Sequence, residues 1–312
     1  MASFFHSVSS VLVILILTSV GYFVGYKGWM NASHKSFLSK FMMNIGLPCM
    51  CLNNLTGSLT HDLVTESLRQ LCVPMIMIPV LFALSFALAK LLHLPRRQLG
   101  PFMAMCSLSN SIFVGYAMCR ELFGAECTAP VMMYYLVHTA LLQSVALGFI
   151  EYSGAPEGTP FTVHNIAQLF RRPLILSLFL SLLLIWFEIP LPSLVVSVTS
   201  YLGGTVSPLG LLFTGFIIYE IGLKNLRITK SLAIMSGMRF LVAPLLCLLV
   251  CRMLGVGELP CSVMTVESAM PCVTQSVVFS SEYGADDKFA AQGAALSTLL
   301  CFLVIPVLML LL

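Results

Sequence analysis

The chain has 312 residues, of which 58% are hydrophobic and only 9% are charged. Soluble domains carry roughly 25% charged residues, so this composition excludes an ordinary soluble protein and indicates a polytopic membrane protein. The net charge of +3 is small and no basic run interleaved with aromatic residues occurs, so nucleic acid is not an expected partner.

Apolar segments that could cross a lipid bilayer, which takes about 20 residues in a helix, follow one another along the whole chain. We predict an all-α polytopic protein with ten transmembrane helices. The first segment lacks the basic start and the small-residue cleavage site of a secretory signal, so we expect it to be retained. The predicted crossings are 4–26, 33–56, 68–93, 98–121, 128–152, 171–190, 192–220, 229–253, 260–282 and 286–312.

Lysine and arginine residues gather on one side of the predicted bundle, and cytoplasmic loops are the side that carries this excess. With the N-terminus outside, twelve of the 16 basic residues fall at inner loops or helix ends and three at outer ones. We therefore predict a multi-pass protein of the plasma or inner membrane with both termini outside. The inner basic residues are Lys27, Lys35, Lys40, Lys90, Arg96, Arg97, Arg171, Arg172, Lys224, Arg227, Lys230 and Lys288.

The two halves of the chain resemble each other after a shift of 160 positions, which places Pro48 on Pro208 and Gly124 on Gly284. Five crossings in each half is an odd number, so the second unit must enter the membrane inverted. Inverted repeats of this kind are found in many secondary transporters. The predicted units are residues 1–152, a linker at 153–165 and residues 166–312.

Each half contains one polar interruption in an apolar segment: SLSNSIFVGYAM in the fourth and ESAMPCVTQS in the ninth. A membrane helix can break only where its freed backbone groups face protein or a wet cavity. The N-termini of half-helices at such breaks bear free N–H groups and a positive partial charge, which suits a carboxylate. We predict crossed, broken helices and an anion site near the midplane. The candidate substrate-binding residues are Asn110, Ser111, Gly115, Pro271, Thr274 and Gln275.

Glu267 and Arg239 are the charges most clearly inside predicted spans, where each costs roughly 2.5–3.5 kcal/mol at the bilayer centre on the insertion scale. They form either a structural ion pair or a coupling site, with Glu267 as proton carrier or Arg239 as anion contact. His138 is a candidate proton relay, although a lone histidine on an apolar helix is more often only packed. The polar patches also have an alternative role, in which Asn110 and Gln275 merely hydrogen-bond across a helix interface.

No enzyme motif such as GxSxG, HExxH, Walker A or GxGxxG is present, so catalysis is not expected. The 11 cysteines show no paired CxxC and predict neither a zinc site nor a disulfide framework. No cofactor is expected, and the coupling ion, H⁺ or Na⁺, stays open. GYFVG, from Gly21 to Gly25, matches the GxxxG packing motif and predicts at most a helix contact.

In order and spacing, several segments resemble the auxin efflux carrier family of membrane transporters. GYFVGYKGW followed by LSKFMMNIGLPC is similar to its opening pair of helices, and SNSIFVGYAM to the asparagine-glycine signature of its fourth. RRPLILSLFLS is similar to the start of its second half, and ESAMPCVTQSVVFSSEYGAD to its ninth and tenth helices. The family includes plant auxin exporters and bacterial malonate or dicarboxylate permeases, and this short chain resembles the bacterial members more.

The resemblance implies two inverted five-helix repeats, with a scaffold domain from helices 1, 2, 6 and 7 and a transport domain from helices 3–5 and 8–10. It also implies an elevator movement of the crossed helices 4 and 9, and a homodimer formed through the scaffold. Asn110 matches the family's substrate-proximal asparagine and Pro271 its ninth-helix proline. Ala117 stands where the family commonly has proline, so the first break would have to rest on Gly115 and its polar neighbours.

These features predict a secondary transporter that moves a small organic anion, auxin-like or a dicarboxylate, by alternating access around Asn110, Pro271 and Gln275. A sodium-coupled organic-anion symporter of related fold is the nearest alternative, although no complete ligand set for a hard cation is visible. A ligand-sensing membrane receptor without net flux is the alternative from another class. The sequence does not determine the substrate or the direction of transport.

Overall fold

The computed structural model describes residues 2–58, 61–156, 173–222 and 227–312. Helices form the regular structure of these ranges, and one isolated bridge is the only strand-like pairing within them. The chain is therefore a helical membrane protein, and the number of ten crossings stays a prediction. Five helical stretches are long and apolar enough to cross a membrane by length and composition: Arg69–Leu91, Thr128–Gly154, Ser193–Glu220, Lys230–Leu254 and Asp287–Leu308.

In the first half, α-helices alternate with short turns, of which η1, η2 and η4 are π-helical. The elements are α1 (Ala2–Tyr26), α2 (Ala32–Phe41), η1 (Met42–Gly46), α3 (Leu47–Ser58), α4 (His61–Leu91), α5 (Arg96–Ser107), η2 (Ser111–Tyr116), α6 (Ala117–Phe123), η3 (Gly124–Cys127), α7 (Thr128–Leu141), η4 (Leu142–Ala146) and α8 (Leu147–Gly154). Because α8 continues to Gly154, the first two positions of the predicted linker are helical. From position 157 the linker lies outside the described residues.

The second half repeats this style of helix with one further π-helical turn, η7. The elements are α10 (Pro173–Trp186), α11 (Ser193–Gly204), α12 (Val206–Ile221), α13 (Lys230–Gly237), η7 (Met238–Val242), α14 (Ala243–Leu254), α15 (Glu258–Ser268), α16 (Gln275–Glu282) and α17 (Asp287–Leu308). Pro48 and Pro208 lie in the first turns of α3 and α12. Helical turns precede both prolines, η1 before α3 and α11 before α12, so each proline removes a backbone hydrogen bond that a continuous helix would have there.

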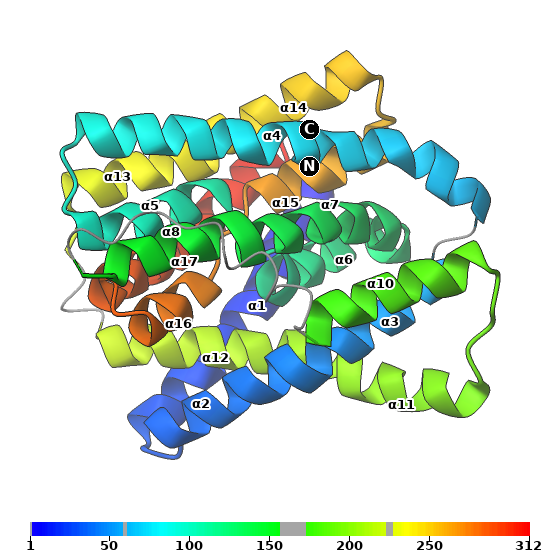
Figure 1. Ribbon diagram of the computed structural model, residues 1–312, viewed down its shortest axis with the longest axis horizontal. Coiled ribbons are helices and arrows are strands. Elements are labelled where there is room, and N and C mark those ends of the chain that lie inside the picture. Colours follow the sequence, from blue (N-terminus) through cyan, green and yellow to red (C-terminus); the bar gives the residue numbers. More distant parts are fainter. Residues whose placement is uncertain (1, 59–60, 157–172, 223–226) are drawn as a thin grey trace.

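The helices pack in a bundle whose long axis lies horizontally in Figure 1, with α2, α11 and α12 along one edge and α4, α13 and α14 along the other. α1 packs against α12, α3 against α10 and α11, and α5 against α4 and α8. Glycines bring α1 and α12 together: a Cβ at Gly21 would lie 2.8 Å from the Leu212 Cα, and one at Gly25 would lie 2.5 Å from the Tyr219 ring. The helix contact predicted from GYFVG is therefore present.

One face of η7 and α14 shows how the bundle meets its surroundings. Leu241, Leu245, Leu249 and Met253 follow one another at intervals of four residues and are each more than half exposed. Residues four apart share one helix face, so these side chains form a continuous apolar stripe. A stripe of this kind is unfavourable in water and is suited to contact with lipid.

Candidate functional site

Both predicted interruptions are present, and they lie against each other. α5 ends at Ser107 and η2 begins at Ser111, whereas α15 ends at Ser268 and α16 begins at Gln275. Ser109 and Cys272 form an antiparallel bridge between the two breaks. The Asn110 N–H donates to the Pro271 carbonyl at 2.7 Å, and the Val273 N–H donates to the Leu108 carbonyl at 3.1 Å. The breaks thus satisfy each other's backbone groups, which no water would do in the bilayer.

The two breaks have different local causes. Pro271 has no N–H and its ring crowds the preceding turn, so it cannot continue α15. The first break lies at residues 108–110, where the Leu108 backbone is extended. The Asn110 carbonyl then accepts from the Gly115 N–H at 2.9 Å and starts the wider π-helical turn. Ala117 has ordinary helical angles beyond this turn, so the first break forms without a proline at that position.

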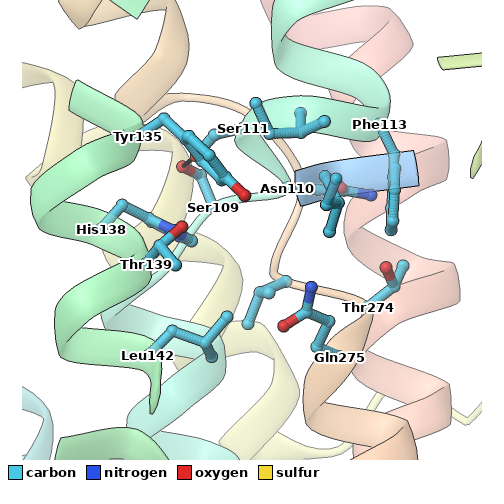
Figure 2. A pocket seen from close by; sticks show the side chains of 13 residues that line it. Ser109, Asn110, Ser111, Phe113, Tyr135, His138, Thr139, Leu142, Thr274 and Gln275 are labelled. Carbon is cyan, nitrogen blue, oxygen red and sulfur yellow. Dashed lines mark hydrogen bonds between the residues drawn. The ribbon is translucent and has the colours of Figure 1, made fainter. Parts of the chain in front are cut away.

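A narrow pocket lies beside the crossing (Figure 2). Four of the six candidate binding residues line it, namely Asn110, Ser111, Thr274 and Gln275. Gly115 and Pro271 do not line the pocket. They shape the breaks instead. The opposite wall is one face of α7, with Tyr135, His138 and Thr139, continued by Leu142 at the start of η4.

The sequence motifs did not point to Tyr135 and Thr139, and they suggested His138 only as a proton relay. Their spacing in the sequence indicates this wall: Tyr135, His138, Thr139 and Leu142 follow the pattern i, i+3, i+4 and i+7 and so share one helix face. Three of the four are polar in an otherwise apolar helix. Such a polar stripe in a membrane span faces protein or a cavity rather than lipid.

Several buried polar atoms around the pocket have no hydrogen-bond partner in the protein. They are Asn110 Nδ2, Tyr135 Oη, both ring nitrogens of His138, Thr274 Oγ1 and Gln275 Oε1. Buried polar groups are nearly always paired in proteins, so a cluster of unpaired ones is unusual. These donors and acceptors are available to a bound molecule. The amide nitrogen of Gln275, Nε2, donates to the Met43 sulfur at 3.2 Å.

Arg239 lies on η7 behind the crossing and is fully buried. Its guanidinium donates to the carbonyls of Cys106 at 3.1 Å, Met270 at 3.0 Å and Ser268. These carbonyls lie at the C-terminal ends of α5 and α15, where the helix dipoles place negative partial charge. The cation therefore neutralises the two C-terminal ends, while the N-terminal ends of η2 and α16 keep their positive partial charge. That charge faces the pocket.

Glu267 is also fully buried, in the last turn of α15. Its Oε1 accepts from the Cys119 thiol at 3.6 Å, and its Oε2 has no partner. The space for the carboxyl group exists because residue 115 is glycine: a Cβ there would lie 2.5 Å from Oε2 and 2.7 Å from Oε1. The structure corrects the idea of a structural ion pair between Glu267 and Arg239, because the guanidinium is occupied by carbonyls and no salt bridge joins the two residues.

A wider pocket of about 550 Å³ opens from the crossing toward the end of the bundle that we predict to be cytoplasmic. We call it the vestibule. Its lining includes Lys35, Lys40 and Asn44 on one side and Glu282 and Asp287 on the other. Gln275 lines both the vestibule and the narrow pocket, so the two adjoin at that residue. A separate outer pocket of about 280 Å³ lies between α6 and the helices α3, α11 and α12.

Comparison with known proteins settles the class of molecule. A family model described as membrane transport protein matches residues 6–309. The chain belongs to this membrane transport protein family. It is the auxin efflux carrier family that the motifs resemble, so the assignment made from the sequence is confirmed. This transporter therefore works at a membrane.

Two archaeal relatives match the transporter along nearly its whole length. An uncharacterized transporter of Methanocaldococcus jannaschii is 25% identical over 300 residues, which cover 95% of each chain. An uncharacterized transporter of Methanothermobacter thermautotrophicus is 24% identical over 313 residues, which cover 97% of each chain. Both names agree with membrane transport, and neither states a substrate.

Proposed function

We propose that the protein is a secondary transporter of the cell membrane, with both termini outside, that moves a small organic anion such as an auxin-like acid or a dicarboxylate. The narrow pocket supports this best. Two half-helix N-termini, each equivalent to roughly half an elementary charge, face it together with unpartnered polar side chains. No lysine or arginine is among the described residues that line it. Two helix ends together match the charge of one carboxylate.

The movement that we propose is an elevator-type alternating access. The helices fall into two groups, α1–α3 and α10–α12 as a scaffold and α4, α5, α7, α8 and α14–α17 as a transport domain. α1 and α12 also contact η2, α6 and α17 across the boundary between the groups. The vestibule and the outer pocket both lie between these groups, one at each end of the crossing. Pockets at both ends of one contact surface are what a sliding transport domain needs.

The contact between the groups at the crossing is suited to sliding. The Phe113 side chain of η2 lies against Gly210 of α12, where a Cβ would approach the ring to 2.4 Å. Because glycine has no side chain, the Phe113 ring can pass Gly210 without a steric obstacle. We further propose a homodimer formed through the scaffold, whose α11 exposes Leu194 and Tyr201.

The experiment that tests this proposal is a ligand screen of the purified protein, followed by a transport assay in proteoliposomes. Mono- and dicarboxylates and indole acids are tested for thermal stabilisation, with Asn110→Ala as the site variant and Gln292→Ala on α17 as the matched amide control. We expect the best anion to stabilise wild type and Gln292→Ala but not Asn110→Ala. Equal stabilisation of Asn110→Ala by every hit would refute the placement of the site.

Flux then separates the candidate functions. In proteoliposomes, a transporter accumulates or exchanges the anion, and a sodium-coupled symporter does so only with a sodium gradient. A receptor binds the anion without net flux, so stabilisation without flux would replace our proposal by the receptor.

A further inference from the structure

We propose that Glu267 carries a proton that moves together with the anion, so that transport is proton symport. This inference rests on the proposed transport function and adds its driving ion. It starts from the position of the carboxyl group, which lies outside the anion pocket but against the same half-helix. The carboxyl group occupies the space that a Cβ at Gly115 would fill, 2.5 Å from Oε2 and 2.7 Å from Oε1, and the Gly115 N–H donates to the Asn110 carbonyl.

Among the described residues, no cation forms a salt bridge with Glu267. Cys119 on α6 contacts Oε1, and Cys127 on η3 and Tyr134 on α7 are the other titratable groups that face the carboxyl group. Arg239 on η7 is held by three carbonyls, and Arg252 of α14 is exposed on that helix's last turn. An ionised carboxylate buried without a counter-ion is very costly, whereas a protonated one is neutral.

Anion binding and protonation of Glu267 are linked through the start of η2. The substrate carboxylate and the Glu267 carboxylate would both draw on one helix end, which favours only about half a negative charge. Two negative charges at this place repel each other. Anion binding therefore favours protonated Glu267, and by reciprocity a protonated Glu267 favours anion binding. The step transfers one proton from a hydronium ion in the aqueous phase to a Glu267 oxygen: one O–H bond of hydronium breaks, one O–H bond to the carboxyl group forms, and water remains.

The same surroundings favour a proton over a sodium ion. A hard cation needs several oxygen ligands around it. The Glu267 carboxyl group is surrounded by the Cys119 sulfur, the Ser111 side chain and the glycine at position 115, which offer one hydroxyl oxygen as a further ligand. Over the described part of the chain there is also no cluster of three or more His, Cys, Asp or Glu residues that could hold a metal ion.

The first test needs no knowledge of the substrate. Infrared difference spectra of the protein in liposomes, recorded between about pH 5 and pH 8, detect the carbonyl band of a protonated carboxyl group. We expect one carbonyl band from a buried, protonated carboxyl group. This band should be lost in Glu267→Gln, shifted in Glu267→Asp, and unchanged in the matched control Glu258→Gln. Absence of a band that depends on Glu267 would overturn the proton carrier, whatever the protein transports.

The second test uses succinate and indole-3-acetate as probes in proteoliposomes. A proton gradient directed inward should accelerate uptake of the accepted probe at least about tenfold, and Glu267→Gln should abolish this acceleration while the probe still stabilises the variant against heat. Acceleration by sodium alone, or an undiminished proton effect in Glu267→Gln, would overturn the inference. If the wild-type protein transports neither probe and no screened anion, the proposed function fails instead. The infrared spectra still show whether Glu267 is protonated.

Discussion

The backbone N–H of Asn110 donates to the carbonyl of Pro271 at 2.7 Å, which joins the two broken helices at their crossing. This bond holds the start of η2 beside the segment that leads into α16. Both half-helices therefore present their N-terminal ends to one pocket. The proposed sites for an anion and for a proton depend on this pairing, because neither half-helix alone would supply a full positive charge.

Replacing Arg239 by methionine should destabilise the protein severely. The guanidinium is the donor to the carbonyls of Cys106, Ser268 and Met270, and removal of one partner from a buried charged network costs about 3–5 kcal/mol. Thermal unfolding in detergent measures the effect. Arg252→Met, on the exposed last turn of α14, is the control and should stay within about 0.5 kcal/mol of wild type. An unchanged unfolding temperature for Arg239→Met would show that the carbonyls do not depend on this cation.

Placing a methyl group at Gly115 should disturb Glu267 directly. A Cβ at this position would lie 2.5 Å from Oε2, and overpacking of a buried site typically costs about 1–3 kcal/mol. Glu267→Ala removes the obstructing atoms, so the double variant should be more stable than the two single effects predict. A double-mutant cycle of unfolding free energies should give a coupling of about 0.5–3 kcal/mol. Simple additivity would mean that the two residues do not meet as described.

Removing the Tyr135 hydroxyl group should weaken anion binding without loss of stability. This buried hydroxyl has no hydrogen-bond partner in the protein, so the folded state loses no bond in Tyr135→Phe. A bound anion would lose one, worth about 0.5–1.5 kcal/mol, or up to about tenfold in affinity. Isothermal titration with the best screened anion measures the change, with Tyr22→Phe on α1 as control. Unchanged affinity would remove the α7 wall from the binding site.

Hydropathy predicted the helical segments well because a bilayer demands long apolar stretches. The predicted span 229–253 coincides closely with the stretch Lys230–Leu254, and 128–152 with Thr128–Gly154. The breaks could also be predicted, because Pro271 and the polar patch around Asn110 contradict a continuous membrane helix. These features are local, and a single sequence records them.

The partners of Arg239 and Glu267 could not be predicted. Backbone carbonyls accept hydrogen bonds at every residue, so the acceptors of Arg239 have no signature in the sequence. The match between Glu267 and Gly115 likewise depends on how α15 crosses η2. Two intramembrane charges of opposite sign suggested an ion pair, but the exposed carbonyls at two helix C-termini satisfy Arg239 instead.

Removing the positive charge of Lys40 should slow delivery of the anion to the site. Lys40 lines the vestibule, whereas its neighbour Lys35 pairs with Glu220 at 2.5 Å. Charges that line a cleft raise the local concentration of an oppositely charged ligand about tenfold or more at low salt. Lys40→Gln should therefore raise the apparent KM from the vestibule side at low salt and lose this effect at about 1 M salt, where charges are screened. Lys90→Gln, outside the vestibule lining, is the control, and an equal KM change in both variants would contradict the prediction.

Gly21→Ala and Gly237→Ala together test the close contact between α1 and α12. A Cβ at Gly21 would lie 2.8 Å from the Leu212 Cα, whereas one at Gly237 on α13 would meet nothing within 4 Å. Gly21→Ala should separate the two helices and cost about 1–3 kcal/mol. Gly237→Ala should stabilise its helix by up to about 1 kcal/mol, because alanine has the higher helix propensity. Thermal unfolding of both variants decides the matter, since two shifts of the same sign would mean that backbone freedom, and not close packing, accounts for the glycine at position 21.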